Sequence, residues 1–224
     1  MLRADLHVHT CHSPDSISSI DAIVERCLKI GIDCLAVTDH NSIRGALELK
    51  GVAPFKVIVG EEVLSTSGEI IGFFLTEEVP HRLTPEETVA RIKAQGGLVC
   101  IPHPFDRFRP HSRLRRAALE SIASSVDLIE VFNSRTLILQ DSARALKFAR
   151  SHGLPGTVGS DAHVIQEIGK SYIELPEFSD AEGFLLALGQ GRAFTHRTSP
   201  LIHFANVRNR LVKRLQRRPP PCTR

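Results

Sequence analysis

The chain has 224 residues, of which 42% are hydrophobic, and its 28 lysines and arginines stand against 25 acidic residues for a net charge of +3. This length fits one or at most two domains with a core of their own, and no apolar stretch approaches the ~18 residues of a membrane-spanning helix. Because no apolar segment follows the lone arginine of MLRADLHVHT, a signal peptide is not expected either.

Short apolar runs alternate along the chain with segments of helical periodicity. Residues 4–10 alternate apolar and polar side chains like a strand, and 33–40 are a continuous apolar run typical of a buried parallel strand. In 84–97, Thr84 and Glu87 have the spacing of a helical capping box. In chain order, the pattern predicts strand 4–10, helix 18–31, strands 33–40, 55–65 and 69–75, helix 84–97, strand 98–104, helix 114–125, strand 126–133, helix 140–153, strands 154–163 and 171–176, and helix 179–191.

This repeated order predicts an α/β fold, with a parallel sheet or barrel covered by helices. No linker rich in Gly, Ser or Pro interrupts the first 205 residues, so we expect a single domain over residues 1–207. Residues 208–224 carry seven Lys or Arg, no acidic residue and three consecutive prolines, which predicts a disordered basic tail. Such a tail could contact RNA or another polyanion, or could be a solvated terminus without a partner.

Side chains that can hold metals stand at or near the C-terminal ends of six predicted strands. The segments are HVH, VTDH, VGEE, CIPHP, IEVFN and VGSDAH. Parallel α/β folds build their sites at this edge of the sheet. A single histidine at a strand end is more often a hydrogen-bonded core residue than a ligand, but six such ends favour one shared site.

His7 and His9 are two residues apart on a strand, so their side chains face the same way. An HxH pair occurs by chance, but this one is accompanied by Asp5, Asp15, His40, Glu62, His103, Asp161 and His163. Imidazole with carboxylate suits Zn, Mn or Fe better than Ca or Mg. The ligands exceed the need of one ion, so we expect two to three divalent transition metals bridged by carboxylates. A hydroxide between them would be a nucleophile near neutral pH, and an anionic substrate such as a phosphate ester would suit the site.

Arginines follow two of these strand ends, and guanidinium groups bind phosphate through paired hydrogen bonds. The candidates for substrate binding are Arg107, Arg109, Arg113 and Arg135. Arg107 and Arg109 are also expected to stabilise charge during catalysis. His12 is a further catalytic candidate, either as a general acid, as a partner behind the metal ligands, or as an exposed residue without a role.

The segments DLHVHTCHSPDS, LAVTDHNSI, VGEEV, IPHP and GSDAH resemble, in order, the motifs of the PHP (polymerase and histidinol phosphatase) family. The resemblance covers residues 5–163. It implies a distorted (β/α)7 barrel like the TIM barrel, with parallel strands and up to three metals at the C-terminal edge. It also implies a stand-alone metal-dependent phosphoesterase, a phosphatase or exonuclease that acts on a nucleotide or a short oligonucleotide phosphate.

The resemblance assigns ligands by position. It places one ion on His7, His9, Glu62 and Asp161, a second on Glu62 and His103, and a third on Asp15, His40 and His163. The family often has a histidine on the strand after the bridging glutamate, where this chain has Glu69, so the second ion's ligands stay open. The family pattern Gly-x-Glu selects Glu62 over Glu61, and only one of them can face inward on a strand. Glu130 and Asn133 are further candidates.

Two other classes compete with a phosphoesterase. Amidohydrolase-type barrels also open with HxH and end with a catalytic aspartate, but the segments TDH and SDAH favour a phosphoesterase. A non-catalytic, metal-stabilised binding module would be expected to have lost ligands. The five cysteines are odd in number and form no CxxC pair, which argues against a disulfide framework and predicts a cytoplasmic protein. The expected partner is a phosphorylated small molecule or a short RNA or DNA end, with no membrane involved; the oligomeric state is open.

Overall fold

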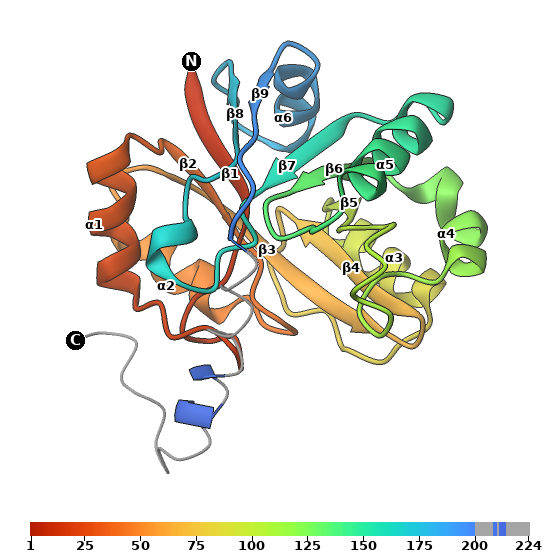
Figure 1. Cartoon of the computed structure of the whole chain (residues 1–224), viewed down its shortest axis with the longest axis horizontal. Coiled ribbons are helices and arrows are strands. Elements are labelled where there is room, and N and C mark those ends of the chain that lie inside the picture. Colours follow the sequence, from red (N-terminus) through yellow and green to blue (C-terminus); the bar gives the residue numbers. More distant parts are fainter. Residues whose placement is uncertain (200–207, 210, 214–224) are drawn as a thin grey trace.

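A computed structural model describes residues 1–199, 208–209 and 211–213 of the chain (Figure 1). The strands within these residues are β1 Leu2–Val8, β2 Cys34–Val37, β3 Lys56–Ser65, β4 Gly68–Phe73, β5 Leu98–Ile101, β6 Leu128–Asn133, β7 Gly156–Gly159, β8 Tyr172–Leu175 and β9 Arg192–Phe194. The α-helices longer than one turn are α1 Ile20–Ile30, α2 Arg44–Val52, α3 Pro85–Ala94, α4 Arg116–Ile122, α5 Leu139–Ser151 and α6 Ala181–Leu188.

The strands form one sheet in the order β7-β6-β5-β4-β3-β2-β1-β8-β9. Strand β1 meets the end of β7, because the Asp161 amide donates to the His7 carbonyl (2.8 Å) and the His9 amide to the Ala162 carbonyl (2.9 Å). The sheet therefore curves into a nearly closed barrel, with α1 and α2 on one side of it and α4 and α5 on the other in Figure 1. The expected α/β barrel is confirmed.

Strand direction is mixed rather than uniformly parallel. The groups β1-β2-β3 and β5-β6-β7 are parallel, whereas β4, β8 and β9 run antiparallel to their neighbours. Only two residues, 66–67, join β3 to β4, and so short a connection can form only a hairpin. Gly68 closes this turn at φ 126°, where a Cβ would lie 2.5 Å from the Arg113 carbonyl oxygen.

The helix signals in the sequence agree with the structure where capping chemistry is present. Thr84 and Glu87 form the expected capping box of α3, and the Ser19 side chain caps α1. Helix α2 was not anticipated. Its N-cap is Ile43, which offers no side-chain acceptor, and glycines stand at positions 45 and 51. Such a helix has weak local signals and depends on packing against its neighbours.

Two hydrophobic clusters lie on opposite faces of the sheet. Alternate residues of β2 belong to different clusters, Leu35 and Val37 to one and Cys34 and Ala36 to the other. The first cluster takes in buried side chains of α1 to α5, whereas the second packs against Phe184 of α6. The packed sheet provides the rigid frame from which the strand ends present their polar residues.

The cysteines divide into two kinds. Cys27, Cys34 and Cys100 are buried free thiols, and burial raises the pKa of Cys27 and of Cys34 to about 12, so they are unreactive core residues. Cys11 is disulfide-bonded, which the odd cysteine count did not predict. The described part of the chain contains no helix of the length and apolar character needed to span a bilayer.

The tail expected to be disordered falls mostly outside the described residues. Within 208–224, the structure describes residues 208–209 and 211–213, and all five are helical. The Asn209 side chain is fully buried. Asn209 and Lys213 of this segment donate hydrogen bonds to backbone carbonyls of the loop after β1.

Candidate metal centre

The nine residues expected to hold metals come together at the strand ends. All are buried except His40, which is partly exposed. They arise from β1, β3 and β4 and from the segments that follow β1, β2, β5 and β7; the residues are His7, His9, Asp15, His40, Glu62, Glu69, His103, Asp161 and His163. Three groups of these ligand atoms lie close enough together to hold a metal ion.

The first group contains the HxH pair. The Nε2 atoms of His7 and His9 are 3.2 Å apart, and each lies 3.5 Å from Oε2 of Glu62. Oδ1 of Asp161 lies 3.3 Å from the His9 Nε2 atom. Four ligands at ~2.1 Å from a tetrahedral ion are about 3.4 Å from one another. The Asp161 Oδ1 atom is buried without a hydrogen-bond partner among the described residues, so this donor set fits an ion.

Glu62 faces different histidines with its two oxygens. Oε1 lies 3.1 Å from Nε2 of His103, and Oε2 lies 3.1 Å from Nδ1 of His40. Glu69 lies beside the same histidines, at 3.6 Å from His103 Nε2 and 3.7 Å from His40 Nδ1. This is the geometry of a carboxylate that can bridge two ions. Glu69 could be a further ligand of the second ion, beside His103.

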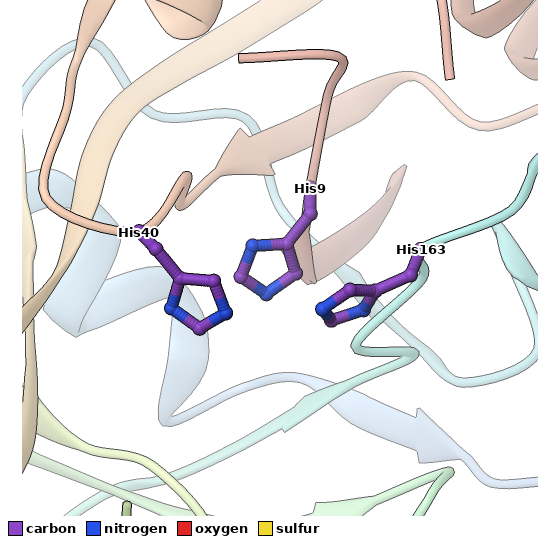
Figure 2. Close-up of side chains that lie close together, drawn as sticks. All are labelled: His9, His40 and His163. Atoms are coloured by element: carbon purple, nitrogen blue, oxygen red, sulfur yellow. The ribbon is translucent and has the colours of Figure 1, made fainter. Parts of the chain in front are cut away.

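The third group is built around three imidazoles, which Figure 2 shows converging from separate segments. The ring centroid of His9 lies 4.6 Å from that of His40 and 4.1 Å from that of His163. Oδ1 of Asp15 lies 3.3 Å from Nε2 of His163 and 3.7 Å from Nε2 of His40. His40 thus faces Glu62 with one ring nitrogen and Asp15 with the other.

The buried charges shift one another's protonation. Burial disfavours the imidazolium form of His7, but the carboxylates of Glu130, Asp161 and Glu62 outweigh burial and raise its pKa well above the ordinary value. Burial likewise disfavours the Asp161 carboxylate, yet Arg109 and neighbouring histidines hold its pKa well below the usual range. So much buried negative charge needs a positive counterpart, which divalent cations would supply.

Glu130 and Asn133 stand behind the ligands. Glu130 Oε1 lies 2.9 Å from Nδ1 of His7, and Oε2 accepts from the His103 backbone amide at 2.8 Å. The Asn133 amide donates to Glu130 at 3.0 Å and to Asp161 at 3.2 Å. A carboxylate on the far nitrogen of a ligating histidine fixes its tautomer and ring orientation.

Asp39 and Ser13 also hold the site together, although neither is among the residues predicted from the sequence to form it. Asp39 accepts from the Thr10 amide (2.7 Å) and the Ser13 hydroxyl (2.9 Å). The Ser13 hydroxyl lies 3.0 Å from Nδ1 of His9 and accepts from the His40 amide at 3.0 Å. The position of Asp39 directly before His40 in TDH was the available signal. The two residues lock the loop after β1 to the end of β2.

The structure separates the two adjacent glutamates of β3 as strand alternation requires. Glu62 points into the cluster, whereas Glu61 accepts from the Val79 backbone amide at 2.8 Å. Burial raises the pKa of Glu61 to about 7. Asp5, the remaining acid of the N-terminal motif, accepts from the amides of Ser160 and Gly169 (both 2.9 Å), and burial raises its pKa to about 6.

One of the four candidate arginines contacts the ligand cluster. The Nη2 atom of Arg109 lies 2.5 Å from Oδ2 of Asp161. Arg107 instead pairs with Asp141 of α5 at 2.9 Å, and Arg113 lines a groove between α4 and α5. Arg135, expected to bind substrate, is buried and donates to Glu167 at 2.7 and 2.8 Å.

His12, like Arg107 and Arg135, pairs with a carboxylate outside the ligand cluster. Its Nε2 atom lies 2.8 Å from Oε2 of Glu48 on α2, and the imidazole is partly exposed. The backbone amide of His12 donates to the Thr10 hydroxyl at 3.1 Å. The structure therefore shows an imidazole–carboxylate pair beside the loop after β1, and a role as general acid stays a prediction.

Two residues of the C-terminal segment reach this loop. The buried Asn209 side chain donates to the backbone carbonyls of Asp15 (3.2 Å) and His163 (3.3 Å). The Lys213 ammonium group donates to the carbonyls of Cys11 and Ser13. Nothing in the basic, proline-containing sequence signalled this docking. Asn209 thereby joins the two residues that would hold the third ion.

Matches to known proteins agree with this arrangement. The family model described as "PHP domain" matches residues 5–98, and the one described as "PHP-associated" matches residues 141–193. The uncharacterized protein MJ0417 of Methanocaldococcus jannaschii is 37% identical over 180 residues, which cover 80% of this chain and 72% of that protein.

Two solved structures share the fold at low identity. One is a two-domain protein from Bacteroides vulgatus, described as containing a predicted PHP-like metal-dependent phosphoesterase; it is 18% identical with a TM-score of 0.69 over 87% of this chain. This chain spans 65% of its length. The other, an amidohydrolase from Chromobacterium violaceum with bound sulfate, is 16% identical with a TM-score of 0.60, covering 92% of this chain and 96% of that one.

A nearly closed α/β barrel that gathers histidines and carboxylates at its strand ends defines a barrel protein with a candidate multinuclear metal centre. Together with the family-model matches and the relative of 37% identity, this places the chain plainly: it belongs to the PHP domain family.

Replacing Asp15 with alanine is expected to cost about one metal ion per chain. Asp15 lies beside His163 and His40 but is not part of the group around the HxH pair. Elemental analysis of the purified variant after loading with Mn²⁺ would measure the loss. A metal content equal to that of the parent chain would contradict the assignment.

Asn209→Ala tests the contribution of the C-terminal segment. Losing the two hydrogen bonds to the carbonyls of Asp15 and His163 is expected to destabilise the fold by about 1–2 kcal/mol. It is also expected to weaken binding of the third metal ion, which these two residues would hold. Urea unfolding and Mn²⁺ titration by calorimetry would measure both quantities. Unchanged affinity for every ion would show that this contact does not support the metal site.

Removing metal is expected to lower the thermal midpoint. An ion present at a hundredfold excess over its Kd stabilises the folded state by about 2.7 kcal/mol, which corresponds to roughly 5–10 °C for a chain of this size. Differential scanning calorimetry with chelator, and again after Mn²⁺ is restored, would measure the shift. An identical midpoint in both conditions would argue against a metal within this buried cluster.

Proposed function

We propose that the chain is a metal-dependent phosphoesterase that hydrolyses a nucleotide or short-oligonucleotide phosphate ester, as a phosphatase or an exonuclease. The observation that carries the proposal is the carboxylate of Glu62, whose two oxygens face separate histidines at 3.1 Å. Two or three Mn, Zn or Fe ions, held by the nine residues named above, would fit these donors. When bound, such metals acidify water and polarise a phosphoryl oxygen.

The chain's own residues supply the remaining parts of the reaction. The Arg109 guanidinium is held beside the cluster by Asp161 and by Asp106, whose Oδ2 lies 3.5 Å from its Nε. From there it can stabilise negative charge on the phosphoryl oxygens. The pair of His12 with Glu48 is a candidate proton donor to the leaving oxygen. Arg107, Arg113 and the exposed surface near them are available to the rest of an anionic substrate.

One paired assay on a single sample tests the function. Metals per chain are determined by elemental analysis, and phosphate release is then measured from 5′-AMP, 3′,5′-bisphosphoadenosine and a short 5′-phosphorylated RNA, with Mn²⁺ and with chelator. We expect two to three ions and chelator-sensitive release. Bound metal without release from any of the three would contradict the nucleotide assignment and favour the amidohydrolase alternative. A chain that binds no metal would contradict the metal centre itself.

The remaining expectations follow from the same proposal. The substrate would be a phosphorylated small molecule or a short RNA or DNA end rather than a membrane component. A cytoplasmic location stays a prediction, and the disulfide-bonded Cys11 does not support the cysteine argument on which it was based.

A further inference from the structure

A groove of about 580 Å³ lies between α4 and α5, outside the metal centre. Both helices lie together at one side of the barrel in Figure 1. Apolar side chains from both helices and from the segment after β5 line it, namely Phe105, Leu114, Leu119 and Phe148. The charged side chains on its walls are Arg113, Arg116, Arg144, Lys147 and Glu120. The groove thus combines an apolar lining with four cations and one carboxylate.

The positive charge is largely uncompensated. Glu120 is paired with Arg116 at 2.8 Å, and Arg144 lies 3.9 Å from Asp141, which is already bound by Arg107. Across the part of the chain that the structure describes, neither Arg113 nor Lys147 has an ion-pair partner. An anion entering the groove would therefore meet two cations that give up no existing ion pair. This favours a ligand with more than one negative charge.

The groove contains two aromatic rings, and one face of the Phe148 ring is already covered by His152, which stacks on it with the centroids 4.0 Å apart. The rings of Phe105 and Phe148 are tilted at 59° with centroids 5.8 Å apart, and both side chains are partly exposed. Aromatic side chains interleaved with cations are typical of surfaces that bind single-stranded nucleic acid, where bases stack and phosphates contact the cations. A plain phosphate or an acidic peptide would leave the aromatic surface unused.

Residues of the groove lie close along the sequence to candidate ligands of the metal centre. Phe105 follows His103 by two residues, and a small cavity lined by both lies beside the groove. On the other wall, the Glu69 amide donates to the Ser112 carbonyl at 2.6 Å, directly before Arg113. One candidate metal ligand therefore precedes a groove residue by two positions in the chain, and a second is hydrogen-bonded to the residue before Arg113.

We propose that this groove binds the nucleotides of a single-stranded oligonucleotide that follow the one whose phosphate is hydrolysed at the metal centre. The proposal rests on the proposed function and narrows it, because a substrate that fills the groove is an oligonucleotide rather than a mononucleotide. Arg113 and Lys147 contact its phosphates, and Phe105 and Phe148 contact its bases. Neither cation takes part in the reaction at the scissile phosphate.

The test is a double charge reversal, Arg113→Glu with Lys147→Glu, in the full chain. Its matched control is Lys29→Glu with Lys50→Glu, which changes the net charge equally on the exposed surface of α1 and α2. Fluorescence anisotropy with a labelled 5′-phosphorylated hexaribonucleotide, in chelator to prevent cleavage, gives the Kd, and 5′-AMP turnover is measured separately with Mn²⁺.

We expect the groove variant to raise the hexanucleotide Kd at least tenfold and to flatten its dependence on log[salt] by about 1.4, for two lost contacts to a single strand. The single variant Lys147→Glu, which leaves the candidate substrate-binding arginines in place, should keep turnover of 5′-AMP within twofold of the parent chain. The α1/α2 control should change the Kd less than threefold. Unlabelled hexanucleotide should displace the probe better than inorganic polyphosphate of equal charge.

Three results would overturn the proposal: an unchanged Kd in the groove variant, an equal loss in the control, or equal competition by polyphosphate. The proposed function fails separately. If no phosphate ester is hydrolysed while hexanucleotide binding still depends on Arg113 and Lys147, the groove stands without the activity. If 5′-AMP is hydrolysed and the groove variant binds hexanucleotide normally, the activity stands without the groove.

Discussion

Glu62→Gln is expected to reduce phosphate release at least ~10³-fold, a loss of about 4 kcal/mol of transition-state stabilisation, while the fold stays intact. The carboxylate is fully buried, and its two oxygens lie 3.1 Å from His103 and 3.1 Å from His40. Glutamine keeps the volume but replaces one oxygen with an amide that cannot ligate a cation in the same way. The two metals that Glu62 would bridge should therefore lose their shared ligand.

Three measurements on Glu62→Gln separate the possible outcomes. Phosphate release gives the effect on activity, elemental analysis gives the ions per chain, and circular dichroism checks the fold. Glu61→Gln is the matched control, because Glu61 is adjacent on the strand but accepts from the Val79 amide away from the cluster. The control should keep activity within about threefold. Full activity in Glu62→Gln would disprove the bridging role.

Arg135→Ala is expected to lower the free energy of unfolding by about 3 kcal/mol, since removing one member of a buried ion pair leaves the other charge uncompensated. Both side chains of the pair are about 1% exposed, and the guanidinium donates twice to Glu167. The same Glu167 carboxylate accepts from the backbone amide of His163 at 3.0 Å. Loss of the arginine should therefore also loosen the loop that presents His163 to the metal centre.

Urea unfolding compares this variant with Arg116→Ala, a matched control at an arginine whose side chain is 85% exposed and pairs with Glu120. An exposed i,i+4 pair contributes about 0.5 kcal/mol or less. A loss at Arg135 no larger than that of the control would mean that its pairing with Glu167 is not structural. Arg135 was expected to bind substrate, and an unchanged stability with a raised KM would restore that role.

The sequence by itself determined the class of fold and most of the residues that gather at the strand ends. Strand alternation and capping chemistry are local, so His7 and His9 could be placed on one strand face and Thr84 at a helix start. The position of Asp161 and His163 after a strand was equally legible. In a parallel α/β barrel the C-terminal ends of the strands lie on one face. The cluster of side chains at these ends was therefore predictable before any distance was known.

Only the tertiary structure decided which partner each polar side chain takes. Arg109 and Arg135 both follow the end of a predicted strand, yet Arg109 contacts Asp161 and Arg135 is buried against Glu167. Long side chains can reach partners from many segments, so their contacts depend on packing that no local pattern encodes. The docking of Asn209 on the loop of Asp15 is of the same kind. It joins residues 194 positions apart, and such a contact exists only once the barrel has closed.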